Sequence, residues 1–195
     1  MSSISLSEFK KLKDLDVQLL DSRPTNDFSS GYISNSINVS INGSFEYMSN
    51  CIFDKEKDLV IISTLERGSE AFLRLEKEDF KSIHLFDFKL WYKANQKLHY
   101  LDRLFAKDAS SYVSHMKDVS NAEDWEVLHV KDVISTPLID IVQNPNIVSK
   151  GDVLYCGNGH KSLAAVSFLK KEGVSTIDIV GGLSAMLVDA PDLEI

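Results

Sequence analysis

The chain has 195 residues, of which 44% are hydrophobic, with a net charge of −8 and two cysteines. This composition is typical of a folded globular protein; the negative charge argues against nucleic acid or an anionic membrane as a partner, and two cysteines exclude a disulfide framework or a zinc-finger cluster. The apolar runs are too short to span a membrane and the polar start does not resemble a signal peptide, so we expect a cytoplasmic protein without a metal or cofactor.

Strands and helices alternate along the first half of the chain. Apolar residues at helical spacing predict helices, and short apolar runs predict buried strands. The expected helices cover residues 5–12, 45–52 and 68–75, the expected strands cover 17–21, 59–63 and 82–86, and a loop over 32–39 leads into a further short strand. This alternation indicates an α/β fold with a parallel sheet covered by helices.

The same pattern begins again in the second half. Asp21 aligns with Asp118, and the strand at 58–62 aligns with the strand at 152–155. A repeat of this length indicates two copies of one small domain, which we place at residues 1–97 and 98–195. The leucines between the copies have roughly helical spacing, which predicts a helical connection over 93–110.

A cysteine follows the strand at 152–155. Gly157 and Gly159 supply a tight loop after Cys156, and Ser162 can cap the helix that comes next. Such a loop directs backbone N–H groups and the positive end of the helix dipole at the sulfur, which favours a thiolate or a persulfide over the neutral thiol. The sequence therefore predicts that Cys156 is a nucleophile.

Both cysteines also have a simpler interpretation, because free cysteines are among the most buried residues. We favour it for Cys51, which has neither glycines nor a cation beside it. For Cys156, the two glycines and the cation that follow favour a functional role. His160 could add positive charge at lower pH or could be an ordinary exposed loop histidine.

Motifs in both halves point to the same family. Asp21-Ser22-Arg23 is similar to a pattern Asp-x-Arg, the run from Cys156 to Ser162 is similar to Cys-x-x-Gly-x-Arg-Ser, and Gly181-Gly182 begins a run similar to Gly-Gly-x-x-Ala-Trp. Together these motifs resemble the rhodanese family of sulfurtransferases, over nearly the whole chain. The resemblance implies two tandem rhodanese-like domains, each with a small parallel sheet flanked by helices.

The first copy departs from the family pattern at the nucleophile. Ser63 or Thr64 stands where the cysteine belongs, and Asp87-Phe88-Lys89 replaces the Gly-Gly turn. A hydroxyl at its normal pKa cannot replace a thiolate as sulfur acceptor. We therefore expect this copy to be inactive.

The second copy departs from the family pattern at three positions. Lys161 replaces the usual arginine of the loop, Ser120 replaces the arginine of Asp-x-Arg, and Met186 replaces the tryptophan. Lysine keeps the positive charge but loses the bidentate fork, so we expect an altered grip on the substrate.

The resemblance implies a reaction in which Cys156 carries sulfur as a persulfide. The sulfane sulfur would come from a small donor, which is thiosulfate, mercaptopyruvate or a persulfide, and would pass to a thiol or cyanide; a protein acceptor is also open. The implied substrate-binding residues are those of the loop, namely Gly157, Asn158, Gly159, His160, Lys161 and Ser162.

Two other functions remain open at this stage. A persulfide carrier or partner-docking module would use the same cysteine without turnover. A cysteine phosphatase of the Cdc25 type, on the same fold, would have an arginine six residues after the cysteine, where this chain has Ser162. The shorter loop disfavours the phosphatase, because a tetrahedral phosphate needs a wider loop and a forked arginine.

Overall fold

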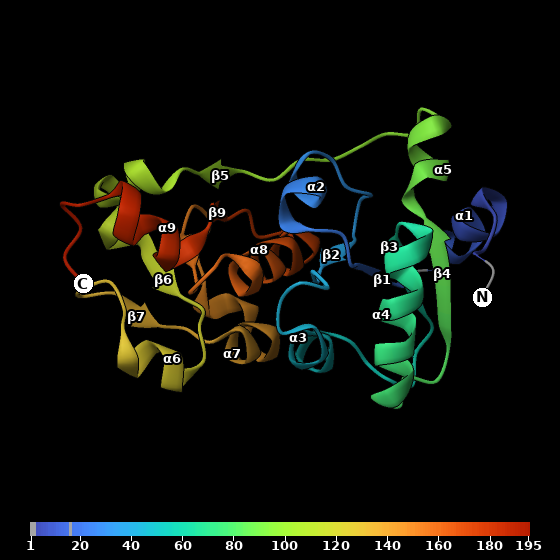
Figure 1. Ribbon diagram of the computed structural model, residues 1–195, viewed down its shortest axis with the longest axis horizontal. Helices are drawn as coiled ribbons and strands as arrows, with labels where there is room; N and C mark the ends of the chain where they lie inside the picture. Colours follow the sequence, from blue (N-terminus) through green and yellow to red (C-terminus); the bar gives the residue numbers. More distant parts are fainter. Residues whose placement is uncertain (1–2, 16) are drawn as a thin grey trace. The chain divides into compact units, whose positions relative to one another are not determined.

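The computed structural model describes residues 3–15 and 17–195 and divides into two compact units, Met1–Tyr100 and Leu101–Ile195 (Figure 1). Each unit has its own sheet of parallel strands flanked by helices. The predicted α/β fold is therefore confirmed. In the part of the chain that the structure describes, no helix combines the length and the apolar character needed to cross a membrane.

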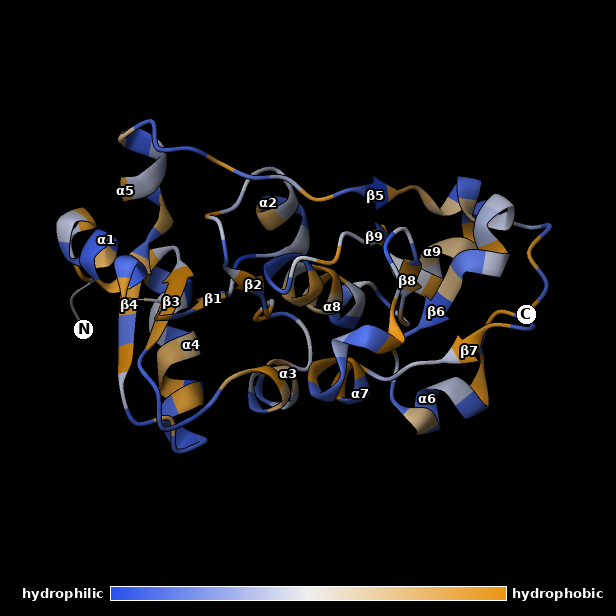
Figure 2. Cartoon of the chain, turned by 180° about the vertical axis from the view of Figure 1, so that it is seen from behind, coloured by the Kyte–Doolittle hydropathy of each residue, from blue (hydrophilic) through white to orange (hydrophobic). Residues whose placement is uncertain are grey.

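The sheet of the first unit has the strand order β2-β1-β3-β4, with parallel pairing throughout. Its strands are β1 (Gln18–Asp21), β2 (Ile37–Asn38), β3 (Leu59–Ser63) and β4 (Ile83–Asp87). Its helices are α1 (Leu6–Asp14), α2 (Thr25–Ser29), α3 (Phe45–Ile52), α4 (Leu65–Lys77) and α5 (Phe88–Lys93). The central strand β3 is buried along its whole length, which explains its continuous apolar run, orange in Figure 2.

Aromatic and aliphatic side chains form the core on one face of this sheet. The rings of Phe9 on α1 and Phe86 on β4 stack with their centroids 4.0 Å apart, and Trp91 on α5 meets Phe9 edge-on at 5.7 Å. A capping box between Ser5 and Glu8 begins α1 in the predicted place. These contacts fix α1 and α5 over the same part of the sheet.

The helix α4 begins three residues before its predicted start at residue 68. Gly68 is a packing residue inside α4, since a Cβ atom there would come within 2.3 Å of Leu85 Cδ1. The glycine therefore lets the helix approach strand β4 closely and does not mark a loop.

The sheet of the second unit has the order β5-β9-β8-β6-β7, again with parallel pairing. Its strands are β5 (Arg103–Leu104), β6 (Met116–Asp118), β7 (Ile134–Ser135), β8 (Val153–Tyr155) and β9 (Ile177–Ile179). Its helices are α6 (Ala122–Val127), α7 (Leu138–Gln143), α8 (His160–Lys171) and α9 (Gly182–Asp189), with 3-10 helices at Ala106–His115 and Pro145–Ile147. The order β9-β8-β6-β7 repeats the order β4-β3-β1-β2 of the first unit.

The predicted helical connection over residues 93–110 is wrong for residues 94–105, and residues 106–110 lie in the 3-10 helix Ala106–His115. The helix α5 ends at Lys93, Asn95 adopts the left-handed conformation with φ 49°, and the chain then runs without helix to the strand β5. Its leucines contact different neighbours, since Leu98 packs on Gly31 whereas Leu104 pairs with Ile179. Equal spacing in the sequence therefore did not indicate one helical face.

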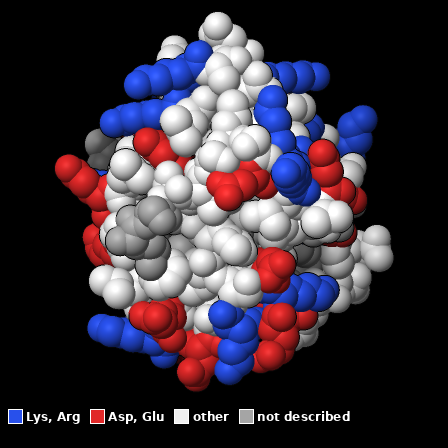
Figure 3. Space-filling model, turned by 90° about the vertical axis from the view of Figure 1, so that its right-hand side faces the viewer, with Lys and Arg blue, Asp and Glu red and all other residues white. Residues whose placement is uncertain are grey.

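Positive and negative side chains are intermingled on the face of the molecule shown in Figure 3. A nucleic-acid surface would gather lysine and arginine on one face to bind phosphates. The face in this view has no such basic patch among the described residues.

Candidate active site

Cys156 lies directly after β8, at the carboxyl end of the second sheet, with 1% of its surface exposed. The side chains of Val153 and Tyr155 belong to the core on one face of the sheet. Cys156 is directed to α8 instead, and its Sγ atom lies 3.8 Å from Ser162 Oγ. The sulfur is thus enclosed between the end of the strand and the first turn of the helix.

The loop from residue 156 to 159 joins β8 to α8. Gly159 precedes the helix with φ 83°, a left-handed conformation that favours glycine. The predicted cap at Ser162 is wrong, because α8 begins at His160 and Ser162 lies inside its first turn. The hydroxyl of Ser162 donates to Asp178 Oδ1 at 2.6 Å and caps no backbone group.

A second glycine turn, Gly181-Gly182 at the start of α9, packs against this loop. Gly182 begins α9 with φ 60°, and a Cβ atom there would come within 2.0 Å of the carbonyl oxygen of Cys156. The amides of Leu183 and Ser184 donate to the carbonyl oxygens of Cys156 and Gly157, at 2.8 and 2.9 Å. The start of α9 therefore fixes the carbonyl side of the loop, which requires glycine at this close approach.

The backbone N–H groups of the loop differ from its carbonyl groups in their hydrogen bonding. Across residues 3–15 and 17–195, no backbone or side-chain acceptor binds the N–H groups of Gly157, Asn158 and Gly159. Unpartnered N–H groups in a loop before a helix favour a bound anion. The loop can therefore offer donors to an anionic sulfur.

The two cations predicted beside the loop are engaged with neighbouring side chains. Lys161 Nζ lies 2.9 Å from Asp124 Oδ2 on α6, and this pairing offsets its charge. His160 Nδ1 lies 2.9 Å from Asn158 Oδ1, and burial lowers the pKa of His160. The imidazole is therefore neutral at neutral pH and adds no cation to the loop.

Sequence reasoning missed two residues behind the cysteine. Asp178 on β9 is fully buried, and its Oδ2 atom accepts from Arg103 on β5, with Nε at 2.8 Å and the nearer terminal nitrogen at 2.7 Å. Burial raises the pKa of Asp178 to about 6, although Arg103 and Ser162 oppose the rise. The sequence signal that could have revealed Asp178 is its position as a lone carboxylate in the apolar run Ile177–Ile179.

Asp21 at the end of β1 and Asp118 at the end of β6 each brace the turn that follows. Asp118 Oδ1 accepts from the amide of Ser120 at 2.8 Å, and Asp21 Oδ1 accepts from the amide of Arg23 at 3.1 Å. In the first unit the guanidinium of Arg23 also pairs with Asp21 and donates to the carbonyl oxygen of Gly31. Ser120 cannot supply that pair in the second unit.

The strand register identifies the residue of the first unit that corresponds to the cysteine. Asp21 pairs with Ile62 and Asp118 pairs with Tyr155, so Ser63 takes the position of Cys156. A single residue separates β3 from α4, whereas four residues separate β8 from α8. The first unit therefore lacks the loop as well as the thiol.

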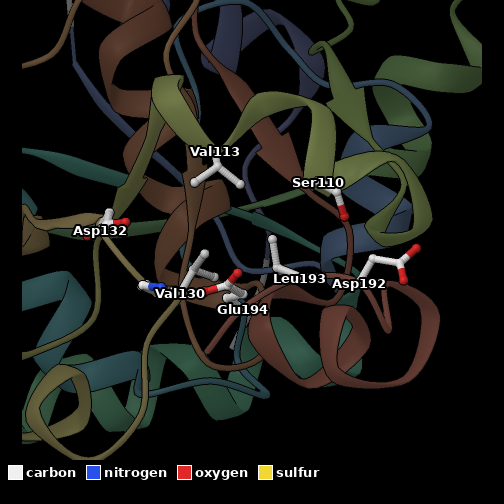
Figure 4. Close-up of a pocket in the computed structure, with 8 residues that line it drawn as sticks. Ser110, Val113, Val130, Asp132, Asp192, Leu193 and Glu194 are labelled. Atoms are coloured by element: carbon white, nitrogen blue, oxygen red, sulfur yellow. Dashed lines mark hydrogen bonds and ion pairs between the residues drawn. The ribbon is translucent and has the colours of Figure 1, made fainter.

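Two cavities of the second unit are lined by residues outside the loop of residues 156–159. One of about 530 Å³ is lined by Phe105, Val180 and Gly181. The other, of about 280 Å³, is bordered by Val130 and by Glu194, which pairs with Lys131 (Figure 4). Over the described residues, no group of three His, Cys, Asp or Glu side chains could hold a metal ion.

Comparison with known families gives one match. Residues 5–94 match the Rhodanese-like domain. The Rhodanese-like domain match lies in the first unit and does not include Cys156. A search of curated protein sequences finds no match to the chain.

Three of the solved structures similar to this chain are the following. A thiosulfate sulfurtransferase from Pseudomonas aeruginosa is 16% identical, with a TM-score of 0.45 over 95% of this chain and 46% of that protein. A probable thiosulfate sulfurtransferase is 14% identical, with a TM-score of 0.42 over 92% and 98% of the two chains. A rhodanese-related protein from Thermoplasma volcanium is 21% identical, with a TM-score of 0.38 over 44% and 90%. The present chain spans less than half of the Pseudomonas aeruginosa enzyme.

Proposed function

We propose that this protein is a rhodanese-type sulfurtransferase that carries sulfane sulfur on Cys156. The proposal treats the two units as tandem rhodanese-like domains that divide near residue 97. The observation that carries it is the loop of residues 156–159, where a buried thiol is followed along the chain by three N–H groups that have no acceptor in the described residues. Such a loop suits an anionic sulfur.

The reaction has two steps, each a transfer of one sulfur atom. The Cys156 thiolate attacks the outer sulfur of the donor, the bond from that sulfur to the rest of the donor breaks, and the leaving group takes the bonding electron pair. A thiol or cyanide then attacks the outer sulfur of the persulfide and returns Cys156 to the thiolate. The amides of Gly157, Asn158 and Gly159 stabilise the charge on the outer sulfur in between.

The first two residues of α8 have supporting roles in this proposal. Lys161, paired with Asp124, positions the first turn of α8 and attracts an anionic donor only weakly. His160 acts as a neutral hydrogen-bonding group beside Asn158. Thiosulfate, mercaptopyruvate and persulfides are all donors that this loop could accept, and no cofactor or metal takes part.

A phosphatase reaction fits the site less well. Ser162 stands six residues after Cys156 where a phosphatase would have an arginine, and its hydroxyl is bound to the buried carboxylate of Asp178. Ser162 offers no bidentate fork, which a tetrahedral phosphate needs.

The proposal is tested by mass spectrometry of the whole protein after exposure to one donor at a time. We expect a mass increase of one sulfur atom on Cys156, removed by cyanide with formation of thiocyanate. The variant Cys156→Ser should lose both signals, whereas Cys51→Ser, which changes the other cysteine, should keep them. Thiocyanate formation that is intact in Cys156→Ser would exclude the proposed function, and sulfur loading without turnover would identify a carrier.

A further inference from the structure

A chain of buried polar side chains lies behind the candidate nucleophile. It runs from Arg103 to Asp178, from Asp178 to Ser162 at 2.6 Å, and from Ser162 to the Sγ atom of Cys156 at 3.8 Å. Asp178 and Ser162 are both fully buried. The sulfur-transfer chemistry described above gives Asp178 no role.

The first unit has an apolar contact at the corresponding place. In the second sheet Leu154 pairs with Asp178, and in the first sheet Ile61 pairs with Leu85, so Leu85 corresponds to Asp178. Leu85 packs against Gly68 of α4, whereas in the second unit Asp178 accepts a hydrogen bond from the hydroxyl of Ser162 on α8. The polar chain therefore accompanies the unit that carries the thiol, although a leucine fits the same fold.

The hydrogen atoms of this chain can be assigned from its chemistry. An ionised carboxylate only accepts hydrogen bonds, and a serine hydroxyl has one hydrogen to donate. Because Ser162 donates that hydrogen to Asp178, its oxygen can only accept from Cys156. A thiol S–H can satisfy this oxygen, whereas a thiolate would face its lone pairs with no hydrogen between them.

The negative charge of Asp178 acts in the same direction, and its pairing with Arg103 offsets part of that effect. Arg103 of β5 is the cation that pairs with Asp178, α8 supplies the neutral Ser162, and the register partner on β8 is the apolar Leu154. Burial raises the pKa of Asp178 to about 6, so the carboxylate is ionised at neutral pH. A buried negative charge two hydrogen bonds from a thiol opposes the loss of the thiol proton.

The remaining charged or titratable groups at the start of α8 and the end of β6 have partners of their own. Lys161 is bound to Asp124, the imidazole of His160 is bound to Asn158, and Asp118 accepts from a backbone amide of its own turn. Arg103 is thus the cation that this part of the chain presents to the carboxylate behind the sulfur.

We propose that Asp178 is a positioning residue that fixes the Ser162 hydroxyl as an acceptor and so holds Cys156 as a neutral thiol at rest. This inference rests on the proposed sulfur transfer. It adds that the site prefers the persulfide anion of Cys156 to the thiolate of the resting cysteine. In the persulfide the charge lies on the outer sulfur, one atom further from Ser162 and available to the loop amides. The site then stabilises a persulfide anion more than a resting thiolate, which limits reactions of the empty cysteine.

The test measures the rate of alkylation of Cys156 by iodoacetamide between pH 5 and 10, followed on the Cys156 peptide of the full-length protein by mass spectrometry. The rate follows the thiolate fraction, and the midpoint of the wild-type profile is the reference for the variants. Asp178→Asn should lower the midpoint by about one unit, so that alkylation at pH 7.5 becomes about tenfold faster. The rate at high pH should stay unchanged.

Two further variants separate this effect from a loss of structure. Ser162→Ala keeps the pair between Asp178 and Arg103 and removes only the acceptor of the thiol, so we expect a smaller fall in the midpoint, about two- to threefold in rate at pH 7.5. Asp21→Asn changes a buried, arginine-paired aspartate of the first unit and should leave the midpoint unchanged.

Midpoints of Asp178→Asn and Ser162→Ala that equal or exceed the wild-type value would overturn the inference. A rise of the high-pH rate with an unchanged midpoint would also overturn it, because that result indicates a loosened site. The alkylation profile does not depend on a sulfur donor, so wild-type protein that takes no sulfur from any donor would reject the proposed function without changing this result.

Discussion

Asp178 is a residue whose ionisation opposes folding. Its carboxyl group is fully buried, and its pKa rises from 3.8 to about 6 in the folded chain. A group with a raised carboxyl pKa holds its proton more tightly in the folded state, so its contribution to the free energy of unfolding falls as the pH rises from about 4 to 6 and is constant above. Arg103 limits this loss by pairing with the carboxylate.

Removing that cation should therefore destabilise the protein in a pH-dependent way. We expect Arg103→Leu to lower the free energy of unfolding by about 3–5 kcal/mol at pH 8, because it leaves a buried carboxylate without its ion pair. At pH 5 the loss should be smaller, because Asp178 then binds a proton. Denaturant unfolding at the two pH values measures the difference.

The matched control is Lys131→Leu, which removes a cation from an exposed pair with Glu194. Exposed pairs contribute little to stability, so this variant should unfold like the wild type at both pH values. An equal loss for Arg103→Leu at pH 5 and pH 8 would contradict the role given to the Asp178 charge.

At the scale of the elements, the junction between strand and helix distinguishes the two units. Thr64 alone joins β3 to α4, so Ser63 is followed almost at once by helical backbone. The second unit has the four residues 156–159 in this place, including the three amides that find no acceptor among the described residues. A nucleophile in the first unit would therefore have no loop donors for an anionic sulfur.

This difference predicts that a thiol alone does not make the first unit active. The double variant Ser63→Cys with Cys156→Ser should take up no sulfur from donors that load the wild type, as measured by mass spectrometry of the peptide that contains residue 63. Uptake at residue 63 at a rate near that of Cys156 would show that the loop is unnecessary. Near-ultraviolet circular dichroism is the check that the double variant is folded.

At the scale of the whole molecule, each unit has a hydrophobic core of its own. Leu154 in β8 and Ile61 in β3 are both fully buried and occupy corresponding positions of the two sheets. Chains with two cores need not unfold in a single step. Local unfolding can therefore be measured in one unit at a time by hydrogen exchange.

A matched pair of cavity-forming variants uses this correspondence. Ile61→Ala should destabilise the first unit by about 2–5 kcal/mol and speed amide exchange in β1, β3 and β4, while Leu154→Ala should do the same for β6, β8 and β9. Hydrogen exchange read by mass spectrometry resolves the two sets of peptides. Equal acceleration in both units for each variant would show that the units unfold together.

The sequence by itself determined the features that depend on neighbouring residues. Strand and helix alternation predicted the α/β fold, and Gly157 and Gly159 after a short strand predicted the loop beside Cys156. These signals are local, because backbone freedom and apolar periodicity act over a few residues. The same local rules failed where a residue serves a distant contact, as with Gly68 against Leu85.

The tertiary structure decided which distant residues surround the sulfur. Arg103 and Asp178 are 75 positions apart and meet because β5 and β9 are neighbours in the sheet, and Lys161 meets Asp124 across 37 positions. Strand order and helix packing set these distances, and no spacing in the chain records them. The thiol could be found from its own loop, whereas the buried side chains behind it could be found only after the fold had brought them together.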